Sequence, residues 1–227
     1  MGVSTRPYLP AAPARTGAER ATLVRRTYAL VFAGVLVTMA GVAFAATQPA
    51  LLGLVARHPF LSAFAWFIPL MAAGSMRARP AAGVGLMFLG NAILGAVLAP
   101  GLLFMEQRQP GIIAQTGLLT GSTFAVLTGY AFVSRRDFSA WGGFLTTGLW
   151  VLIGTSLLNL FFRNAVADLW IAAVGTLLFS GLLVFDTWRL RNVYGPDDYV
   201  PAAIQIYLDL LNLFLFLLRI LSGGRRN

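Results

Sequence analysis

Two consecutive apolar stretches near the C-terminus decide the fold: LLFSGLLVFDTWRLRN (residues 177–192) and PAAIQIYLDLLNLFLFLLRI (residues 201–220). Each stretch is suited to a membrane helix and contains one carboxylate, Asp186 in the first and Asp209 in the second. A charged side chain within such a helix is energetically costly and usually faces the protein interior or a water-filled cavity. The two aspartates are therefore the strongest candidates for a functional site.

Composition indicates a polytopic membrane protein. It has 227 residues, of which 58% are hydrophobic and 11% charged, against about 25% charged residues in a typical soluble domain. Because cysteine is absent and His58 is the single histidine, the sequence excludes disulfides, thiolate metal sites and histidine-based zinc sites or triads. We predict an all-α membrane protein with seven transmembrane helices, each near the ~20 residues that cross ~30 Å of hydrocarbon. The expected spans are about 27–47, 59–76, 81–99, 111–133, 138–162, 169–188 and 201–221.

The domain organisation predicted around these spans is simple. Residues 1–24 form a mobile basic tail, residues 25–221 the transmembrane domain, and residues 222–227 a short basic C-terminal tail. The end of the first span, VAFAAT, has the small residues of a signal-peptidase site, but the apolar run is longer than a usual signal peptide. We therefore expect the first span to be retained.

The net charge of +9 comes with arginine as the sole basic residue type. These arginines lie in short loops, which indicates the positive-inside rule and not nucleic-acid binding. A cytoplasmic N-terminus places eleven of them inside and three outside. The inside set is Arg6, Arg15, Arg20, Arg25, Arg26, Arg77, Arg79, Arg135, Arg136, Arg189 and Arg191, and the outside set is Arg57, Arg108 and Arg163. This orientation leaves three C-terminal arginines outside, so a re-entrant last segment remains an alternative to a full seventh crossing.

With that orientation, three charges lie at similar depth in the cytoplasmic half of the membrane. Asp186 is near the cytoplasmic end of the sixth span, and Asp209 is about 12 Å into the seventh at 1.5 Å per residue. Arg77 ends the second span on the same side. The spacing brings the three charges to one level but does not establish contact between them.

The seventh span also carries a polar seam, one narrow stripe at helical spacing. Its members are Gln205, Asp209, Asn212, Phe216 and Arg219. Apart from Tyr207, every polar side chain of the span lies on this stripe. Such a helix usually packs inside a bundle, with the seam facing a cavity or a polar partner.

Each of these residues also has a plainer interpretation. Asp186 can be a boundary carboxylate solvated beside Arg189, whereas Asp209 has apolar residues on both sides. Arg77 can be a topological anchor. We interpret the arginines of the other inside loops, Arg135, Arg136, Arg189 and Arg191, as anchors.

Three segments resemble the Bax inhibitor-1 (TMBIM) family in its bacterial branch. They are FDTWRLRN (185–192), AAIQIYLDLLNLFLFLLRIL (202–221) and GYAFVSRRDFSAWGGFL (129–145). The resemblance covers about residues 20 to 224 and implies seven helices, with the last at the centre and six around it. It also implies a multi-pass protein of the bacterial inner membrane that acts as a pH-sensitive calcium leak channel. By the same resemblance, Asp186 and Asp209 form the proton-sensing pair, and Arg77, within MRAR, is a latch on that pair.

Two carboxylates held together favour sharing one proton, which links the two helices. Loss of that proton brings two negative charges together and attracts a cation. Calcium prefers carboxylate oxygens, so Asp186 and Asp209 are also a transient calcium site, beside a pore seam of Gln205, Asn212 and Arg219. The expected partners are the lipid bilayer, calcium ions and protons, with no resident cofactor and no nucleic acid.

Two alternatives to the channel come from different classes. Paired aspartates are also the arrangement of intramembrane aspartyl proteases, but the motifs here are FDT and YLD and no GxGD occurs, so we do not expect an enzyme. A non-conducting regulator that binds another membrane protein, such as a membrane protease, remains the second interpretation.

Overall fold

The computed structural model describes residues 17–223. Every regular element in that range is an α-helix. The helices are α1 (Gly17–Ala46), α2 (Pro49–Arg57), α3 (Pro59–Ala65), α4 (Phe67–Ser75), α5 (Pro80–Arg108), α6 (Ile112–Val133), α7 (Trp141–Phe162), α8 (Ala165–Asn192) and α9 (Tyr199–Gly223). Proline begins α2, α3 and α5, a position where its missing N–H costs nothing and its fixed φ suits the helix.

Six helices of the described chain are long and apolar enough to cross a membrane, namely α1 and α5 to α9. The chain is therefore a multi-pass membrane protein. The expected second span, residues 59–76, is divided into α3 and α4, which are separated at Trp66. Together with α2 it forms a pair bent by 105°. A seventh crossing requires this bent pair to count as one span, so the seven-span arrangement stays a prediction.

The predicted tails differ from the helix ends. Helix α1 begins at Gly17 and α9 ends at Gly223, so residues 17–24, expected in the mobile tail, are helical. The rest of the predicted tails, residues 1–16 and 224–227, lies outside the described residues. Arg6, Arg15, Arg225 and Arg226 are among them.

Glycines let α1 and α5 approach each other closely. A Cβ on Gly41 would collide with the carbonyl oxygen of Ala92, and one on Gly95 would collide with that of Thr38. Small residues are the usual means of close helix packing in membranes, where water does not drive apolar association. This pairing fixes α1 and α5 as one unit beside α9.

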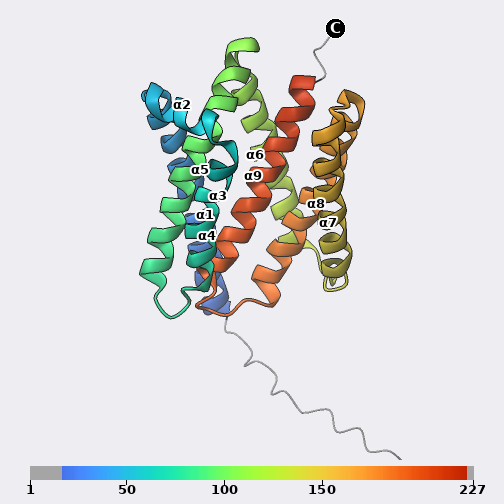
Figure 1. The fold of residues 1–227 in the computed structure, drawn as a ribbon. Coiled ribbons are helices and arrows are strands. Elements are labelled where there is room, and N and C mark those ends of the chain that lie inside the picture. The colour runs from blue at the N-terminus through green and yellow to red at the C-terminus, as the bar shows by residue number, and fades with distance from the viewer. Residues whose placement is uncertain (1–16, 224–227) are drawn as a thin grey trace, which may run out of the picture.

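Helix α9 lies in the middle of the bundle and runs obliquely across it (Figure 1). It packs against α1, α4, α5, α6 and α8, whereas α7 packs against α8. The expected ring of six helices around α9 is therefore incomplete within the described chain, because α7 lies outside it. The side of α9 away from α6 remains accessible between the two halves of the molecule.

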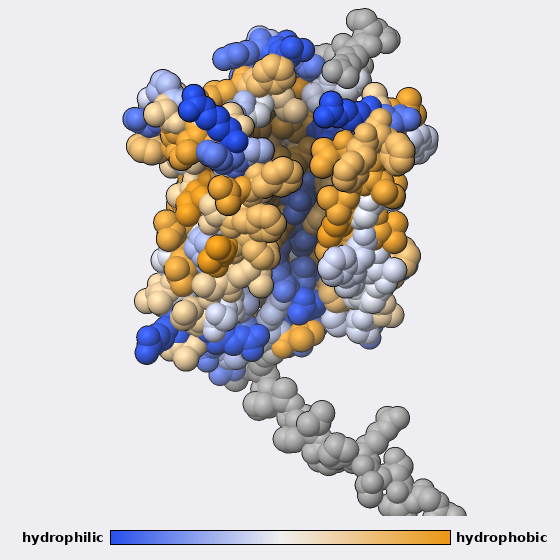
Figure 2. Space-filling view, viewed as in Figure 1, coloured by the Kyte–Doolittle hydropathy of each residue, from blue (hydrophilic) through white to orange (hydrophobic). Residues whose placement is uncertain are grey.

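The surface agrees with this arrangement. Figure 2 shows hydrophilic residues at both ends of the molecule and apolar residues along its flanks, as expected for a protein embedded in lipid. A hydrophilic strip also runs along the hollow in the middle of this face, where Figure 1 places α9. The partly exposed polar residues of that helix include Gln205 and Asn212, and Arg219 is exposed.

Candidate functional site

The two aspartates singled out in the sequence lie together between α8 and α9. Asp186 is 6% exposed and Asp209 is 5% exposed. The structure brings their carboxyl groups within hydrogen-bonding reach of each other. Their placement follows from the chain, because the short loop of residues 193–198 returns α9 alongside the end of α8. The sequence predicted only that the two aspartates lie at similar depth, and in the structure they are also neighbours.

The hydrogen bonds around these carboxyl groups are uneven. Asp186 Oδ1 accepts a hydrogen bond from Arg189 Nη1 at 2.9 Å. Asp209 Oδ2 is buried and receives no N–H or O–H from residues 17–223 outside the pair. A buried polar atom without a partner is costly. A proton shared between the two aspartates would supply the missing hydrogen bond.

Arg189 is the basic residue of this site. Its Nη1 also donates to Gln205 Oε1 at 2.7 Å, so one guanidinium connects α8 to α9. Asp186 and Arg189 are three residues apart on α8, which places them on the same face of the helix. The guanidinium carbon lies 4.9 Å from the ring centre of Tyr194, a cation–π distance. Arg189 thus belongs to the site, a role that was not predicted for it, while its role as a topological anchor stays a prediction.

Tyr194 completes the network from the loop between α8 and α9. Its hydroxyl donates to Gln205 Oε1. Burial, opposed by Arg189 and assisted by the nearby aspartates, raises the pKa of Tyr194 to about 12. The phenol therefore remains protonated and able to donate at any physiological pH. Tyr194 was not predicted as a site residue, because it stands in a polar loop with no periodicity to mark it.

Arg77 lies at the same end of the molecule but contacts a different carboxylate. Its Nε is 3.3 Å from Asp198 Oδ1, and its side chain is 65% exposed. Asp198 also accepts a hydrogen bond from the backbone N–H of Gly195. The pair thus ties the turn after α4 to the loop before α9. In this structure Arg77 pairs with Asp198, whereas Arg189 is the arginine bonded to Asp186.

Arg191, also interpreted as an anchor, has a structural role. Its guanidinium donates to the carbonyl oxygens of Ala131, Phe132 and Ser134 at 3.3, 2.6 and 3.0 Å. The last carbonyls of a helix have no partner within that helix, and a basic side chain at this end is favourable. Arg191 therefore joins the end of α6 to the end of α8.

The polar seam of α9 is not continuous. Asn212 Nδ2 bonds the carbonyl of Leu208 on its own helix at 2.8 Å. Phe216 stacks on Phe179 with ring centres 5.7 Å apart and fills the notch left by Gly175, where a Cβ would meet its ring. Arg219 lies at the far end of the seam. Phe216 is therefore an apolar interruption between the aspartate pair and Arg219.

The donor set of this site suits transient binding of a cation. Within residues 17–223, no group of three or more His, Cys, Asp or Glu residues could hold a metal ion. Two carboxylates and the Gln205 carbonyl oxygen offer fewer ligands than the six to eight oxygens that calcium prefers. The described residues of this site therefore lack the ligand set of a resident calcium ion.

The comparisons with known proteins agree with one another. The family model described as "Inhibitor of apoptosis-promoting Bax1" matches residues 20–227. Bax inhibitor 1 of Schizosaccharomyces pombe is 32% identical over 212 residues, which cover 92% of this chain and 79% of that protein. A Golgi anti-apoptotic protein of Vaccinia virus (strain Lister) is 42% identical over 115 residues, 51% of this chain and 48% of that protein. A membrane protein of Vibrio cholerae is 40% identical over 143 residues, 62% of this chain and 63% of that protein. The chain belongs to the Bax inhibitor-1 (TMBIM) family.

Proposed function

We propose that this protein is a pH-sensitive cation leak pathway, with Asp186 and Asp209 as its proton sensor. The observation that carries the proposal is the pair of buried carboxyl groups between α8 and α9, with one buried oxygen that has no other hydrogen-bond donor among the described residues. Buried carboxyl groups in contact are coupled in their titration and respond to pH as one unit. The family, whose relatives include a protein named as anti-apoptotic, is not a known enzyme family.

The hydrogen bonds favour Asp209 as the carrier of the proposed shared proton. Asp186 already accepts from the Arg189 guanidinium, and this charge-assisted bond favours the ionised carboxylate. Asp209 then donates its proton to Asp186 and links α9 to α8. Loss of that proton puts two negative charges in contact, which repel each other and attract a cation. Binding of the proton therefore holds α8 and α9 together, and loss of the proton favours their separation.

Arg189 sets the charge balance of the pair. Its guanidinium contacts Asp186 and Gln205 together, so it can neutralise one carboxylate but not both. When both are ionised, one negative charge remains for a cation to balance. This assigns to Arg189 the latch that the family resemblance assigns to Arg77.

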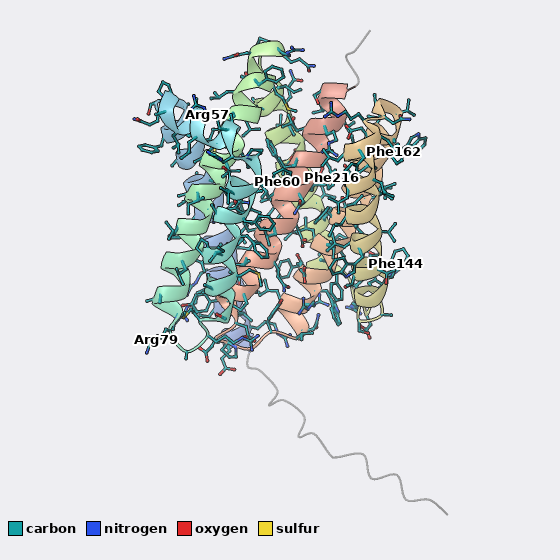
Figure 3. All side chains as sticks on the ribbon, in the orientation of Figure 1. Arg57, Phe60, Arg79, Phe144, Phe162 and Phe216 are labelled. Atoms are coloured by element: carbon teal, nitrogen blue, oxygen red, sulfur yellow. The ribbon has the colours of Figure 1, made fainter. Side chains whose placement is uncertain are left out.

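The path proposed for the cation follows the seam of α9. Gln205 and Asn212 are partly exposed on the side where Figure 2 shows the hydrophilic strip. Phe216 interrupts the seam above them, as its labelled side chain beside α9 shows in Figure 3. A polar path with an apolar constriction favours slow passage gated by wetting, which is a leak. Calcium is the cargo we propose, because carboxylate and carbonyl oxygens are its preferred ligands.

Calcium entry into proteoliposomes tests this function. We expect entry that changes between pH 6, 7 and 8 and is absent from protein-free liposomes. Asp137→Asn, which removes an exposed loop carboxylate, is the matched control and should keep the wild-type pH profile. Absence of calcium entry at every pH would contradict the channel and favour the second interpretation, a non-conducting regulator of another membrane protein. Cleavage of an added transmembrane peptide would indicate an aspartyl protease instead.

A further inference from the structure

Tyr207 is the polar side chain within residues 201–221 that lies off the seam of α9, and the proposed cation path does not use it. The side chain is 1% exposed, so its hydroxyl depends on a partner inside the bundle. That partner is Thr38 on α1, whose Oγ1 is 2.6 Å from the tyrosine oxygen. Since Thr38 donates its own proton to the carbonyl oxygen of Gly34 at 2.9 Å, Tyr207 is the donor to Thr38. This hydrogen bond joins α9 to α1.

The ring of Tyr207 also packs against α1 at a glycine. A Cβ on Gly34 would lie 3.4 Å from Tyr207 Cδ2 and 2.5 Å from Nδ2 of Asn91 on α5. Glycine therefore leaves room for both side chains at this point. Gly34 and Thr38 belong to the buried face of α1 and are about one helical turn apart. Helix α1 thus holds Tyr207 by packing against its ring and by a hydrogen bond to its hydroxyl.

Helix geometry places Tyr207 and Asp209 on opposite sides of α9. Successive residues of an α-helix are about 100° apart, so two residues are separated by about 200°. Asp209 faces α8, where its carboxyl group meets that of Asp186, and Tyr207 faces α1. Both α1 and α8 pack against α9. One polar contact on each side therefore holds α9 between these two helices.

Apolar contacts alone select the rotation of α9 only weakly. Outside the seam, residues 201–221 are apolar apart from Tyr207. Lipid tails are as apolar as these side chains, so exchanging one apolar face for another costs little in a bilayer. A hydrogen bond is directional, and a buried hydroxyl left without a partner is costly. A single buried polar contact can therefore fix the register of one helix against another.

We propose that Tyr207 is a positioning residue, which through Thr38 holds the rotation of α9 so that Asp209 meets Asp186. The proposal rests on the proposed function, because it concerns how the same aspartate pair is brought together. A rotation of α9 by one residue, about 100°, would take Asp209 away from α8. Tyr207 therefore acts on the aspartate pair from the other side of α9, without contacting it.

The charge around Asp209 comes from other residues. Asp186 and Arg189 of α8 and Tyr194 of the preceding loop are the titratable groups that act on it or respond to it. Helix α4 has no titratable residue, and α6 has Tyr130, which is exposed. The charged residues of α1 lie in its first ten residues and those of α5 in its last three. Since a threonine hydroxyl does not titrate, Thr38 contributes orientation and not charge.

Two cysteines in place of the aspartates report the rotation of α9 without relying on channel function. Because the chain has no native cysteine, Asp186→Cys with Asp209→Cys gives one pair of thiols. A bis-methanethiosulfonate reagent with a one-carbon bridge joins these thiols when they are close. Mass spectrometry separates the bridged protein from protein whose thiols are modified separately. The cysteine pair is prepared alone and together with Tyr207→Phe, Thr38→Val or both.

We expect Tyr207→Phe to lower the initial rate of bridging about fivefold, the factor by which losing one hydrogen bond of ordinary strength shifts an equilibrium. Thr38→Val should lower the rate equally, and both changes together should lower it no further, because they remove the same bond. Thr120→Val is the matched control. Thr120 is also buried, but its hydroxyl bonds the carbonyl oxygen of Thr116 within α6. This control should leave the bridging rate unchanged.

With both aspartates intact, Tyr207→Phe should also shift the pH profile of calcium entry. Carboxyl groups that are less often in contact share a proton less readily. The midpoint of the profile should therefore move to lower pH, by about 0.7 unit for a fivefold change in contact. A general loss of stability would lower the amount of folded protein without moving this midpoint.

An unchanged bridging rate in both Tyr207→Phe and Thr38→Val would overturn the proposal and assign the rotation of α9 to apolar packing. A lower bridging rate with an unchanged midpoint would also overturn it, because the position of Asp209 would then not control proton sharing. If Tyr207→Phe loses its native thermal transition, Thr38→Val supplies the same comparison with α9 intact. Absence of calcium entry from the wild type would contradict the proposed function, whereas the bridging rates would still decide what positions Asp209.

Discussion

Helix α8 has an arginine–aspartate pair near each end, and the two pairs differ in burial. At its C-terminal end Asp186, with a side chain 9% exposed, accepts from Arg189 at 2.9 Å. At its N-terminal end Asp168 and Arg219 are 3.4 Å apart and half exposed. A carboxylate removed from water depends on its partner, whereas one in water gains little from it. The same residue types therefore form a buried, mutually dependent pair at one end and a solvent-exposed, loosely held pair at the other.

The largest difference between the two pairs should appear when each arginine is neutralised. Arg189→Gln should cost about 1–3 kcal/mol of stability, less than a fully buried pair would lose because Arg189 is partly exposed. Arg219→Gln, the matched control, should cost under about 0.5 kcal/mol. Thermal unfolding in detergent measures both, with about 2–4 °C expected per kcal/mol. Equal shifts for the two variants would refute the distinction by burial.

A smaller effect is expected at the edge of the buried pair. Tyr194→Phe removes one hydrogen bond to Gln205 and should cost about 1 kcal/mol, while Arg189 still bonds the same oxygen.

Because the folded-state pKa of Tyr194 is about 12 and an unfolded tyrosine titrates near 10, the native protein binds this proton more tightly. Wild-type stability should therefore fall between about pH 10 and 12, and this fall should be weaker in the phenylalanine variant. An unchanged alkaline profile would remove Tyr194 from the network.

The smallest effect is expected at Arg77. Because Arg77 is largely exposed and contacts Asp198, Arg77→Gln should change stability by less than about 0.5 kcal/mol and leave the pH profile of calcium entry unchanged. The latch inferred from the family resemblance predicts the opposite, a raised basal leak. Flux measurements on Arg77→Gln beside Arg189→Gln decide which arginine balances the aspartate pair.

Much of the fold could be predicted from hydropathy, because the bilayer requires apolar helices of fixed length. Six of the expected spans correspond to single helices, with ends displaced by up to ten residues, the largest shift being at the start of α1. The broken second span could not be predicted, since hydropathy measures the apolar content of residues 59–76 but not the direction of the chain. The contact of α7 with α8 alone was also hidden, because periodicity defines a helical face and not its neighbour.

The candidate site shows the same limit at the level of single residues. Asp186 and Asp209 were accessible to sequence reasoning because a carboxylate in an apolar helix is costly wherever it points. Arg189 was interpreted as an anchor, although its spacing of three residues from Asp186 was the available signal. The latch role of Arg77 stays a prediction: in this structure Arg77 contacts Asp198, because equal depth in the membrane does not determine which side of the bundle a residue faces.

The most direct test of the central claim is calcium entry at pH 6, 7 and 8 for the wild type, Asp186→Asn, Asp209→Asn and the double variant. Asparagine keeps the size and hydrogen-bonding capacity of aspartate but cannot titrate. Because the two carboxyl groups act as one unit, each single variant should lose nearly all of the pH dependence, and the double variant should lose little more. Wild-type pH profiles in both single variants would contradict the account and leave the two aspartates with a structural role.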